Sequence, residues 1–332
     1  MNIDVSVVIV NYKTPSLTCA CIKSIKDFTD GVNFEIIVID NNSDDGSVDF
    51  IQKVHSDVNV IAHHDNAGTS IAYNIGIKAA KGQYILIQNS DTEYYENSIK
   101  IALDEYKRLE RNEKVGLLAC QIKGFDGVIQ YNSNMSFLGF KHFLRSNPIA
   151  IKLNMFQTKL SNQERLELHQ KNHNPAWLGI PFGMFNKEIC SNENLYFDQD
   201  IFMYYDDEEW CYRLKRNGYS HKFIIKTAIL HVNGASSEDF SEWRFGQITV
   251  SRLLFIIKTK GKSGYVLLGF ILLFNYVLFK LLNRKKLDLK TISTEALELM
   301  IIKKYYFKVF SYSKKTSEQY NYLKYDVNTK LI

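Results

Sequence analysis

Short, almost uninterrupted runs of branched apolar residues recur through the N-terminal part of this chain. Val5–Val10 and Phe34–Ile39 are the clearest, and polar residues follow each of them at once. A run without polar alternation is typical of a strand that is covered on both faces, as in a parallel sheet. Shorter runs of the same kind lie at Val58–Ala62, Tyr84–Ile87 and Val115–Ala119. The chain must therefore fold around a sheet with helices on both sides.

Segments with helical periodicity separate these runs. Helices are predicted from Pro15, over Asp49–Val54, Thr69–Ala80 and Ser98–Arg111, and later over Phe202–Arg216. This alternation predicts the α/β class, with a Rossmann-like, open, mostly parallel sheet flanked by helices. The stretch from Asn132 to Asn174 matches no clear pattern, and we interpret it as a variable insertion.

Polar side chains gather where successive predicted strands end. In open α/β sheets, ligands bind in the crevice outside the carboxyl ends of the strands. Aspartate and asparagine are also common turn formers, which is the alternative explanation for any one of these groups. Three successive groups favour a binding site. Its candidate residues are Asn11, Asp40, Asn42, Asp44, Asp45 and Asp91.

Several common site types are missing from the sequence. No GxxxxGK[ST] loop is present, which disfavours a P-loop kinase or NTPase, and no GxGxxG follows the first strand, which disfavours a nicotinamide-dependent dehydrogenase. Cys19 and Cys21 have one residue between them, so the five cysteines indicate neither a zinc site nor a disulfide scaffold. The N-terminus has no basic region followed by a cleavage site, so we expect no secretory signal.

Charge is distributed unevenly along the chain. The net charge is +5, but residues 258–332 carry +10 and the preceding residues carry −5. A basic tail on an acidic body predicts contact with an anionic surface, although a merely solubilising tail is equally consistent with the charge. Nucleic-acid binding is disfavoured because the body is acidic and the tail contains no recognisable module.

Two acidic features point to chemistry. The carboxylate of Asp91, at a predicted strand end, is a hard oxygen ligand suited to Mg²⁺ or Mn²⁺. The run Asp206–Glu209 places like charges together, so an enclosed member should have a raised pKa and suit the role of general base. Stabilisation of a helix N-terminus by negative charge is the structural alternative for this run.

Taken in order, these motifs resemble family-2 glycosyltransferases of the GT-A fold, especially the bacterial rhamnosyltransferase-like branch. The resemblance covers roughly residues 4 to 260. It is carried by SVVIVNYKT (Ser6–Thr14), EIIVIDNNSDDGS (Glu35–Ser47), NAGTSIAYNIGIKAAKGQYILIQNSDT (Asn66–Thr92), WLGIPFGMFNKE (Trp177–Glu188), FDQDIFMYYDDEEWCYRLKRNGY (Phe197–Tyr219) and ILHVNGASS (Ile229–Ser237).

The resemblance implies a role for each matching residue. On the donor side, the nucleobase would be bordered by Val10, Asn11 and Tyr12. Asp40 would hydrogen-bond the nucleobase, with Asn42 and Asp45 nearby. The pocket under the sugar and diphosphate would be shaped by Asn66, Gly68 and Asn74. The DxD-type motif falls on Asn89-Ser90-Asp91, with Asp91 as main metal ligand and His231 as second ligand. Asp206-Asp207 match the [ED]D motif, with Asp207 as catalytic base, followed by Glu209 and Arg213.

The implied organisation has two parts. Residues 1–260 would form the GT-A catalytic domain, with a nucleotide-binding half over about 1–125 and an acceptor-binding half over about 126–260. Residues 261–332 would form a basic, apolar, helical extension that associates with a membrane. Ser263–Phe279 is uncharged and, as a helix, only about 26 Å long, at the short limit for crossing a bilayer. Its cationic flanks favour a segment in the interface over a buried core helix, with membrane contact through 258–290.

The resemblance therefore predicts an inverting, metal-dependent glycosyltransferase with Mn²⁺ or Mg²⁺ as cofactor. Its donor would be a UDP- or dTDP-linked sugar, such as rhamnose. Its acceptor would be a saccharide or lipid-linked saccharide in cell-surface polysaccharide biosynthesis, reached from the cytoplasmic face of the inner membrane. The alternatives are a sugar nucleotidyltransferase and a catalytically degenerate membrane scaffold on the same fold. The oligomeric state stays open.

Overall fold

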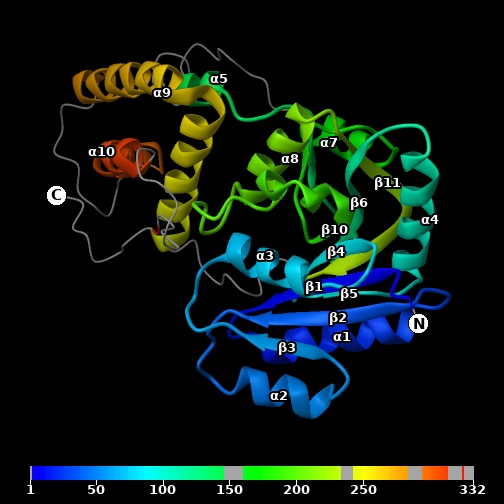
Figure 1. The fold of residues 1–332 in the computed structure, drawn as a ribbon. Coiled ribbons are helices and arrows are strands. Elements are labelled where there is room, and N and C mark those ends of the chain that lie inside the picture. The colour runs from blue at the N-terminus through cyan, green and yellow to red at the C-terminus, as the bar shows by residue number, and fades with distance from the viewer. Residues whose placement is uncertain (1, 146–159, 233–241, 283–293, 313–323, 325–332) are drawn as a thin grey trace. The chain divides into compact units, whose positions relative to one another are not determined.

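The structure is a computed structural model that describes residues 2–145, 160–232, 242–282, 294–312 and 324 (Figure 1). The chain divides into two compact units. Unit 1 comprises Met1–Phe137, Ser161–Gln199 and Asp206–Glu238, and unit 2 comprises Leu138–Leu160, Asp200–Tyr205 and Asp239–Ile332. We describe each unit by itself.

The first half of the sheet in unit 1 is parallel, as the branched apolar runs predict. Its strands lie in the order β3-β2-β1-β4, and all neighbours in this part run parallel. The strands are β1 (Val5–Asn11), β2 (Phe34–Asp40), β3 (Asn59–Ala62) and β4 (Tyr84–Asn89). In register, Asn11 lies beside Asp40 at the carboxyl edge, so the first two polar groups become neighbours.

The second half of the sheet is mixed, and most of it has no signal in the sequence. The order continues β10-β6-β11-β5, with β10 antiparallel to both of its neighbours and β11 parallel to β6. These strands are β5 (Thr92–Glu93), β6 (Val115–Lys123), β10 (Phe182–Asn186) and β11 (Ser220–His231). The short strand β7 (Ile129–Gln130) pairs with β6. A separate two-stranded sheet pairs β8 (Ser133–Asn134) with β9 (Trp177–Leu178). The short β5 pairs antiparallel with the end of β11 and thereby places Asp91 beside the last residues of that strand.

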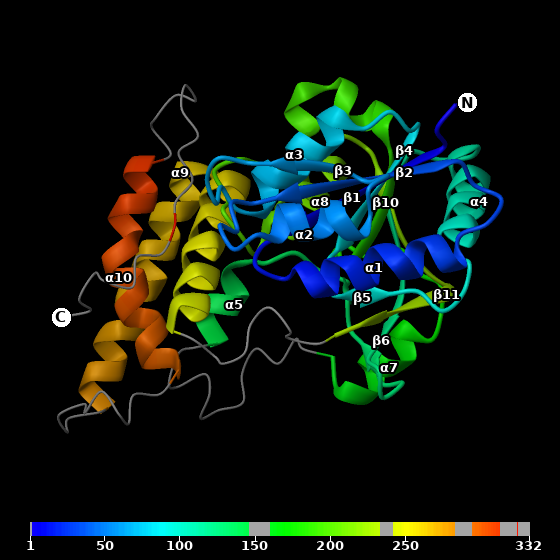
Figure 2. The ribbon, with the colours of Figure 1, turned by 90° about the horizontal axis from the view of Figure 1, so that it is seen from below.

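Helices cover both faces of the sheet. Helix α1 lies on one face and α3 on the other, and α4 and α8 flank the second half (Figures 1 and 2). The helices of unit 1 are α1 (Pro15–Phe28), α2 (Ser47–Val54), α3 (Thr69–Ala79), α4 (Ser98–Glu110), α7 (Asn162–His169) and α8 (Asp206–Arg216), with 3₁₀ turns at Lys187–Ser191 and Glu193–Leu195.

One predicted helix begins four residues too early. The pattern predicts a helix over Phe202–Arg216, but α8 begins at Asp206. Tyr204 and Tyr205, directly before it, have φ of 64° and 62°, in the left-handed region that a right-handed helix cannot contain. The prediction was wrong because apolar spacing does not report a backbone reversal. As a result, the two aspartates stand at the helix N-terminus and not in its second turn.

The core of unit 1 depends on close approach between α3 and β1. Val8 is completely buried, and a Cβ built on Gly76 of α3 would lie 2.2 Å from its Cγ1. Only a glycine lets the helix sit this near the strand. The cysteines Cys19, Cys21, Cys120, Cys190 and Cys211 are all buried and unbridged, in keeping with the predicted absence of a disulfide scaffold.

Unit 2 contains α5 (Phe140–Arg145), α9 (Glu242–Leu282) and α10 (Thr294–Tyr312). Gly261, with φ 69° and ψ −178°, breaks the helical backbone of α9 next to the boundary predicted at residue 260, and that functional boundary stays a prediction. Across the described residues, we find no helix with the length and hydropathy needed to span a bilayer. Residues 283–290 of the predicted membrane segment, including Arg284, Lys285 and Lys286, lie outside the described residues, as do 146–159 of the predicted insertion.

Candidate functional site

The ends of β1 and β2 form a buried polar cluster. Asn11 Nδ2 donates to Asp40 Oδ2 at 2.6 Å, and the Ser43 hydroxyl donates to the same oxygen at 2.6 Å. The backbone N–H of Ser43 donates to Asp40 Oδ1 at 2.9 Å, and Thr18 donates to Asn11 Oδ1 at 2.7 Å. Asp40 is therefore the anchor that orders the loop after β2. Its contact with a nucleobase remains a prediction.

A neighbouring asparagine joins this cluster to the next loop. Asn41 is 3% exposed, and its Nδ2 donates to Asn66 Oδ1 at 3.1 Å and to the Gly68 carbonyl at 3.3 Å. Gly68 has φ 84°, in the region that favours glycine, and it precedes the first turn of α3. The predicted donor-pocket residues Asn66 and Gly68 are thus linked to the strand end that carries Asp40.

The remaining residues predicted around the nucleobase lie toward solvent. Val10 is partly buried, Tyr12 is 42% exposed, and Asn42 is exposed with φ 59°. Asp45 accepts bonds from the Ser47 N–H and hydroxyl at the start of α2, and these hydrogen bonds lower the pKa of its carboxyl. This edge is accessible and polar, as a surface for a nucleoside requires.

The two predicted metal ligands, far apart in sequence, lie next to each other. Asp91 Oδ1 is 3.3 Å from His231 Nε2, and the Val232 N–H donates to the Asp91 carbonyl at 2.9 Å. The pairing of β5 with the end of β11 produces this contact, with His231 opposite Thr92. Both side chains are largely buried, with exposed fractions of 9% for Asp91 and 14% for His231.

Gln130 orients the His231 ring. Gln130 Nε2 donates to the His231 carbonyl at 3.0 Å, and its amide oxygen lies 2.7 Å from His231 Nδ1. Because an amide oxygen only accepts, Nδ1 carries a proton, and the other ring nitrogen, Nε2, is directed toward Asp91. An imidazole nitrogen beside a carboxylate oxygen, with the second ring nitrogen held by an outer partner, is a donor set that fits a divalent cation.

The predicted catalytic aspartates occupy the first turn of α8. Thr69, at the first turn of α3, donates to Asp206 Oδ2 at 2.8 Å. Asp207 Oδ1 accepts from the Glu208 N–H at 2.7 Å, and Oδ2 faces Gly179. Burial raises the pKa of Asp206, and burial together with the negative charge of Asp206 raises that of Asp207 well above its usual range.

Tyr73 connects the two acidic groups. Burial is the main cause that raises the pKa of its hydroxyl, and the negative charges of Asp206, Asp207 and Asp91 raise it further. The hydroxyl also donates weakly to Asn89 Oδ1, at 3.4 Å. Tyr73 therefore lies near both the candidate metal ligand Asp91 and the candidate base Asp207.

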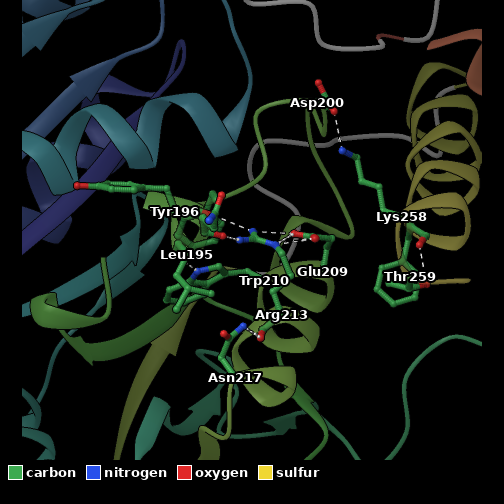
Figure 3. Close-up of polar contacts among 12 residues, drawn as sticks. Leu195, Tyr196, Asp200, Glu209, Trp210, Arg213, Asn217, Lys258 and Thr259 are labelled. Atoms are coloured by element: carbon green, nitrogen blue, oxygen red, sulfur yellow. Dashed lines mark hydrogen bonds and ion pairs between the residues drawn. The ribbon is translucent and has the colours of Figure 1, made fainter. Parts of the chain in front are cut away.

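Three other predicted residues, Asn74 and the pair Glu209 and Arg213, hold the backbone of a neighbouring segment in place. Asn74 is 2% exposed and exchanges hydrogen bonds of 2.9 Å with the carbonyl and N–H of Phe197. Glu209 and Arg213 form a two-pronged ion pair, and Arg213 also donates to the Tyr196 carbonyl at 2.8 Å (Figure 3). These contacts fix the segment before α8. Asn74 thus shapes the site indirectly, through that segment.

Sequence reasoning missed several residues that build the site. They are Asn41, Ser43, Thr69, Tyr73, Gln130 and Gly179. The first four lie inside motifs already singled out, so proximity along the chain could have found them. Gly179 likewise lies inside the quoted motif Trp177–Glu188. Gln130 had no such signal, because only the strand pairing brings it to His231 and Asp91.

A second group of metal-ligating side chains follows β3. His63, His64 and Asp65 each have a ligand atom within 4.8 Å of the others. His63 Nδ1 is already engaged by the Asp65 carbonyl at 2.8 Å, and the two imidazole rings pack with centroids 4.4 Å apart. Local contacts within this turn, in which only His64 is exposed, account for the group, and we assign no ligand to it.

Comparison with known proteins identifies similar chains. The model of the family described as Glycosyl transferase family 2 matches residues 6–174, about half of the chain. Glycosyltransferase GlyG of Streptococcus pneumoniae serotype 4 is 31% identical over 115 residues, covering 34% of this chain and 38% of that protein. A diacetamido-dideoxy-glucuronosyltransferase of Methanococcus voltae is 22% identical over 194 residues, covering 56% and 53%. This chain thus spans only about a third to a half of the length of these relatives.

Solved structures share the architecture. The mannosyltransferase PcManGT of Pyrobaculum calidifontis, in complex with GDP-Man and Mn²⁺, aligns with a TM-score of 0.56 at 12% identity, covering 95% of this chain and 89% of that one. S. aureus TarS 1–349, in complex with UDP-GlcNAc, aligns with a TM-score of 0.52 at 16% identity, covering 92% and 81%. At these identities the likeness shows the fold alone.

Proposed function

Because this chain belongs to glycosyl transferase family 2 and has the GT-A fold, we propose that it transfers a sugar from a nucleoside diphosphate sugar to an acceptor hydroxyl, with inversion. One observation carries the proposal. Asp91, which pairs with His231, and the aspartates at the start of α8 all lie near Tyr73, close enough for their charges to act on its hydroxyl. These two groups serve the two ends of a single displacement, which are the leaving group and the nucleophile.

Asp207 is the general base of the proposed reaction. The acceptor oxygen forms a bond to the anomeric carbon, the bond from that carbon to the diphosphate breaks, and the diphosphate leaves with the electron pair. The acceptor proton passes to Asp207. Asp206 positions the base, because Thr69 holds its carboxylate and its charge helps to raise the pKa of Asp207. No covalent intermediate with the enzyme is needed.

Asp91 and His231 would hold a divalent cation, Mn²⁺ or Mg²⁺. The fit rests on the orientation of the His231 ring, which Gln130 holds so that Nε2 faces Asp91 Oδ1. When bound, the cation neutralises charge on the diphosphate and improves it as a leaving group. Asn89 replaces the first acid of the DxD-type motif, so Asp91 supplies the carboxylate of this motif.

The donor would lie along the edge from Asn11 to Gly68. We propose a UDP- or dTDP-linked sugar, with rhamnose as the candidate that the resemblance to the rhamnosyltransferase-like branch supplies. The solved neighbours hold UDP-GlcNAc and GDP-Man, so GDP belongs in the test. Motifs do not determine the sugar, because the pocket walls discriminate between sugars through individual hydrogen bonds.

The acceptor would be a saccharide or lipid-linked saccharide in cell-surface polysaccharide biosynthesis. The name of the Methanococcus voltae relative specifies a dolichyl-phosphate-linked sugar as its acceptor. A lipid-linked acceptor would place the present enzyme at the cytoplasmic face of the inner membrane, as a peripheral protein. The basic, apolar residues of the C-terminal extension support that location.

The test uses the full chain and measures nucleotide binding and turnover separately. Thermal shifts with UDP, dTDP, GDP and CDP, each with and without Mn²⁺, should show a metal-dependent rise with one or two nucleotides. Release of that nucleotide from its sugar donors then reports turnover. Asp207→Asn should lower turnover by about 10²–10⁴-fold and leave the nucleotide shift intact.

The matched control is Asp104→Asn, which removes an exposed carboxylate on α4. It should change neither readout. A folded protein that shifts with no nucleotide would favour the degenerate scaffold, and a fully active Asp207→Asn variant would remove Asp207 as the base.

A further inference from the structure

The second part of α9 presents an apolar face to solvent. Among its described side chains, six large apolar ones are exposed, with exposed fractions between 43% and 67%: Val266, Leu267, Phe270, Leu273, Phe274 and Val277. Their spacing of three, four and seven residues places them on one side of the helix. We call this set the α9 face. A soluble helix normally carries polar residues on its outer side.

The opposite side of the same helix is already packed within unit 2. Tyr265 is fully buried and stacks on Tyr306 of α10 with ring centroids 4.5 Å apart. Asn275 is also fully buried and donates to the Phe143 carbonyl of α5 at 2.7 Å. Among the described residues of unit 2, the α9 face therefore lies on the side of the helix away from these packing contacts, and its apolar character needs another explanation.

Basic side chains accompany this face. Lys262 is exposed and lies one helical turn before Val266 and two turns before Phe270. On α10, Phe307 is 73% exposed and its neighbour Lys308 is exposed. No aspartate or glutamate occurs between residues 258 and 282. The second part of α9 therefore combines large apolar side chains with unbalanced positive charge.

We propose that the α9 face inserts into the headgroup region of an anionic lipid bilayer, with the second part of α9 lying along the interface. Aromatic and aliphatic side chains on one side of a helix, next to lysines, match the chemistry of such a surface. A second copy of the chain is a poorer occupant, because its own α9 brings lysines and no carboxylate. Crossing the bilayer is not required, and no described helix has the length and hydropathy for it.

This inference deepens the membrane location in the proposed function by naming the surface that makes it. The inference rests on the proposed function in one respect only: membrane binding would serve to bring the active site to a lipid-linked acceptor. Binding to lipid is measured without turnover. A failure of the inference is thus distinguishable from a failure of the transferase assignment, which nucleotide release on a soluble acceptor tests.

The experiment is co-sedimentation of the full chain with vesicles of phosphatidylcholine alone or with ~30% phosphatidylglycerol. We expect binding to the anionic vesicles, weakened by salt. Phe270→Glu with Phe274→Glu should lower the partition coefficient at least about tenfold. Lys262→Gln with Lys308→Gln should lower it by roughly fivefold per lysine.

The matched control is Phe28→Glu with Phe125→Glu, which introduces the same charges at phenylalanines of unit 1 that are 41% and 57% exposed. It should bind vesicles like the unmodified chain. Cooperative thermal unfolding with the Tm of the unmodified chain verifies that each variant is folded. Equal binding by the Phe270/Phe274 variant overturns the proposal. A dimer in solution that this variant converts to a monomer, without vesicle binding by either, also overturns it and assigns the face to a second copy.

Discussion

Gly179 offers the most direct test of where the acceptor lies. It connects β9 to β10, and its N–H donates to the Asn132 carbonyl at 2.8 Å. A Cβ built on it would lie 3.6 Å from Asp207 Oδ2 and 3.7 Å from the Asn132 carbonyl oxygen, both ordinary contact distances. The backbone there is not in the left-handed region. Gly179→Ala is therefore tolerated by the fold, and its methyl group lies against the proposed base.

The size of the effect follows from the reach of the base. A general base must approach the oxygen that it deprotonates to about 2.6–3.2 Å. A methyl group in contact with the same carboxylate oxygen occupies part of that approach and displaces the acceptor. A misplacement of about 1 Å costs on the order of 10²-fold in rate. We expect Gly179→Ala to lower kcat/KM for the acceptor by about 10–100-fold.

The assay is steady-state transfer with the donor and the acceptor varied in turn. The affinity for the nucleotide and the Tm should be unchanged, because Gly179 lies at the acceptor side of Asp207 in the proposed reaction. Gly139→Ala is the control, since a Cβ there meets no atom within 4 Å, and its kinetics should match those of the unmodified chain. Full acceptor kcat/KM in a folded Gly179→Ala variant would refute the placement of the acceptor in front of Asp207.

Three further predictions concern the base, the cation and the core. A general base works only when it is deprotonated, so activity should fall as the pH drops through the raised pKa of Asp207. Asp206→Asn removes a like charge beside Asp207 and should therefore move this acidic limb of the pH–rate profile to lower pH. An unmoved limb would contradict this coupling. Gln130→Met frees the imidazole that Gln130 orients and should weaken Mn²⁺ binding by about 10–100-fold in calorimetry; unchanged affinity would argue against the metal site. Gly76→Ala should gain about 1 kcal/mol of stability through helix propensity but lose about 1–3 kcal/mol or more through the clash with Val8. Urea unfolding should therefore show a net decrease in the free energy of unfolding, which the additional substitution Val8→Ala should partly restore.

The first half of the sheet was predictable because its signals are local. The runs at β1 and β2 are branched and apolar because both faces of these strands are buried. Helix α1 begins at Pro15, and proline is tolerated there because the N–H groups of the first helical turn have no acceptor within the helix. Asp40 follows β2 directly, so its place at the carboxyl edge follows from the direction of the chain.

The second half was less predictable because its strands depend on partners. β5 contains two residues, too few for any periodicity, and it forms because the end of β11 lies beside it. The true start of α8 depends on two tyrosines in left-handed conformation, which the apolar pattern does not register. The pairing of the distant His231 with Asp91 as metal ligands was predicted only from the family resemblance. The structure shows that His231 Nε2 lies 3.3 Å from Asp91 Oδ1 because the end of β11 pairs with β5.

The sequence by itself determined the sheet class, the strand ends that carry polar groups, and the family motifs, because hydrophobic period and residue chemistry are properties of short segments. It also marked the C-terminal extension as apolar and basic. Only the tertiary structure decided which groups meet. It holds the His231 ring through Gln130, brings three aspartates near Tyr73, places Gly179 beside Asp207, and leaves one side of α9 exposed. These depend on strand pairing and helix packing between residues remote in the chain, and no local pattern encodes such pairings.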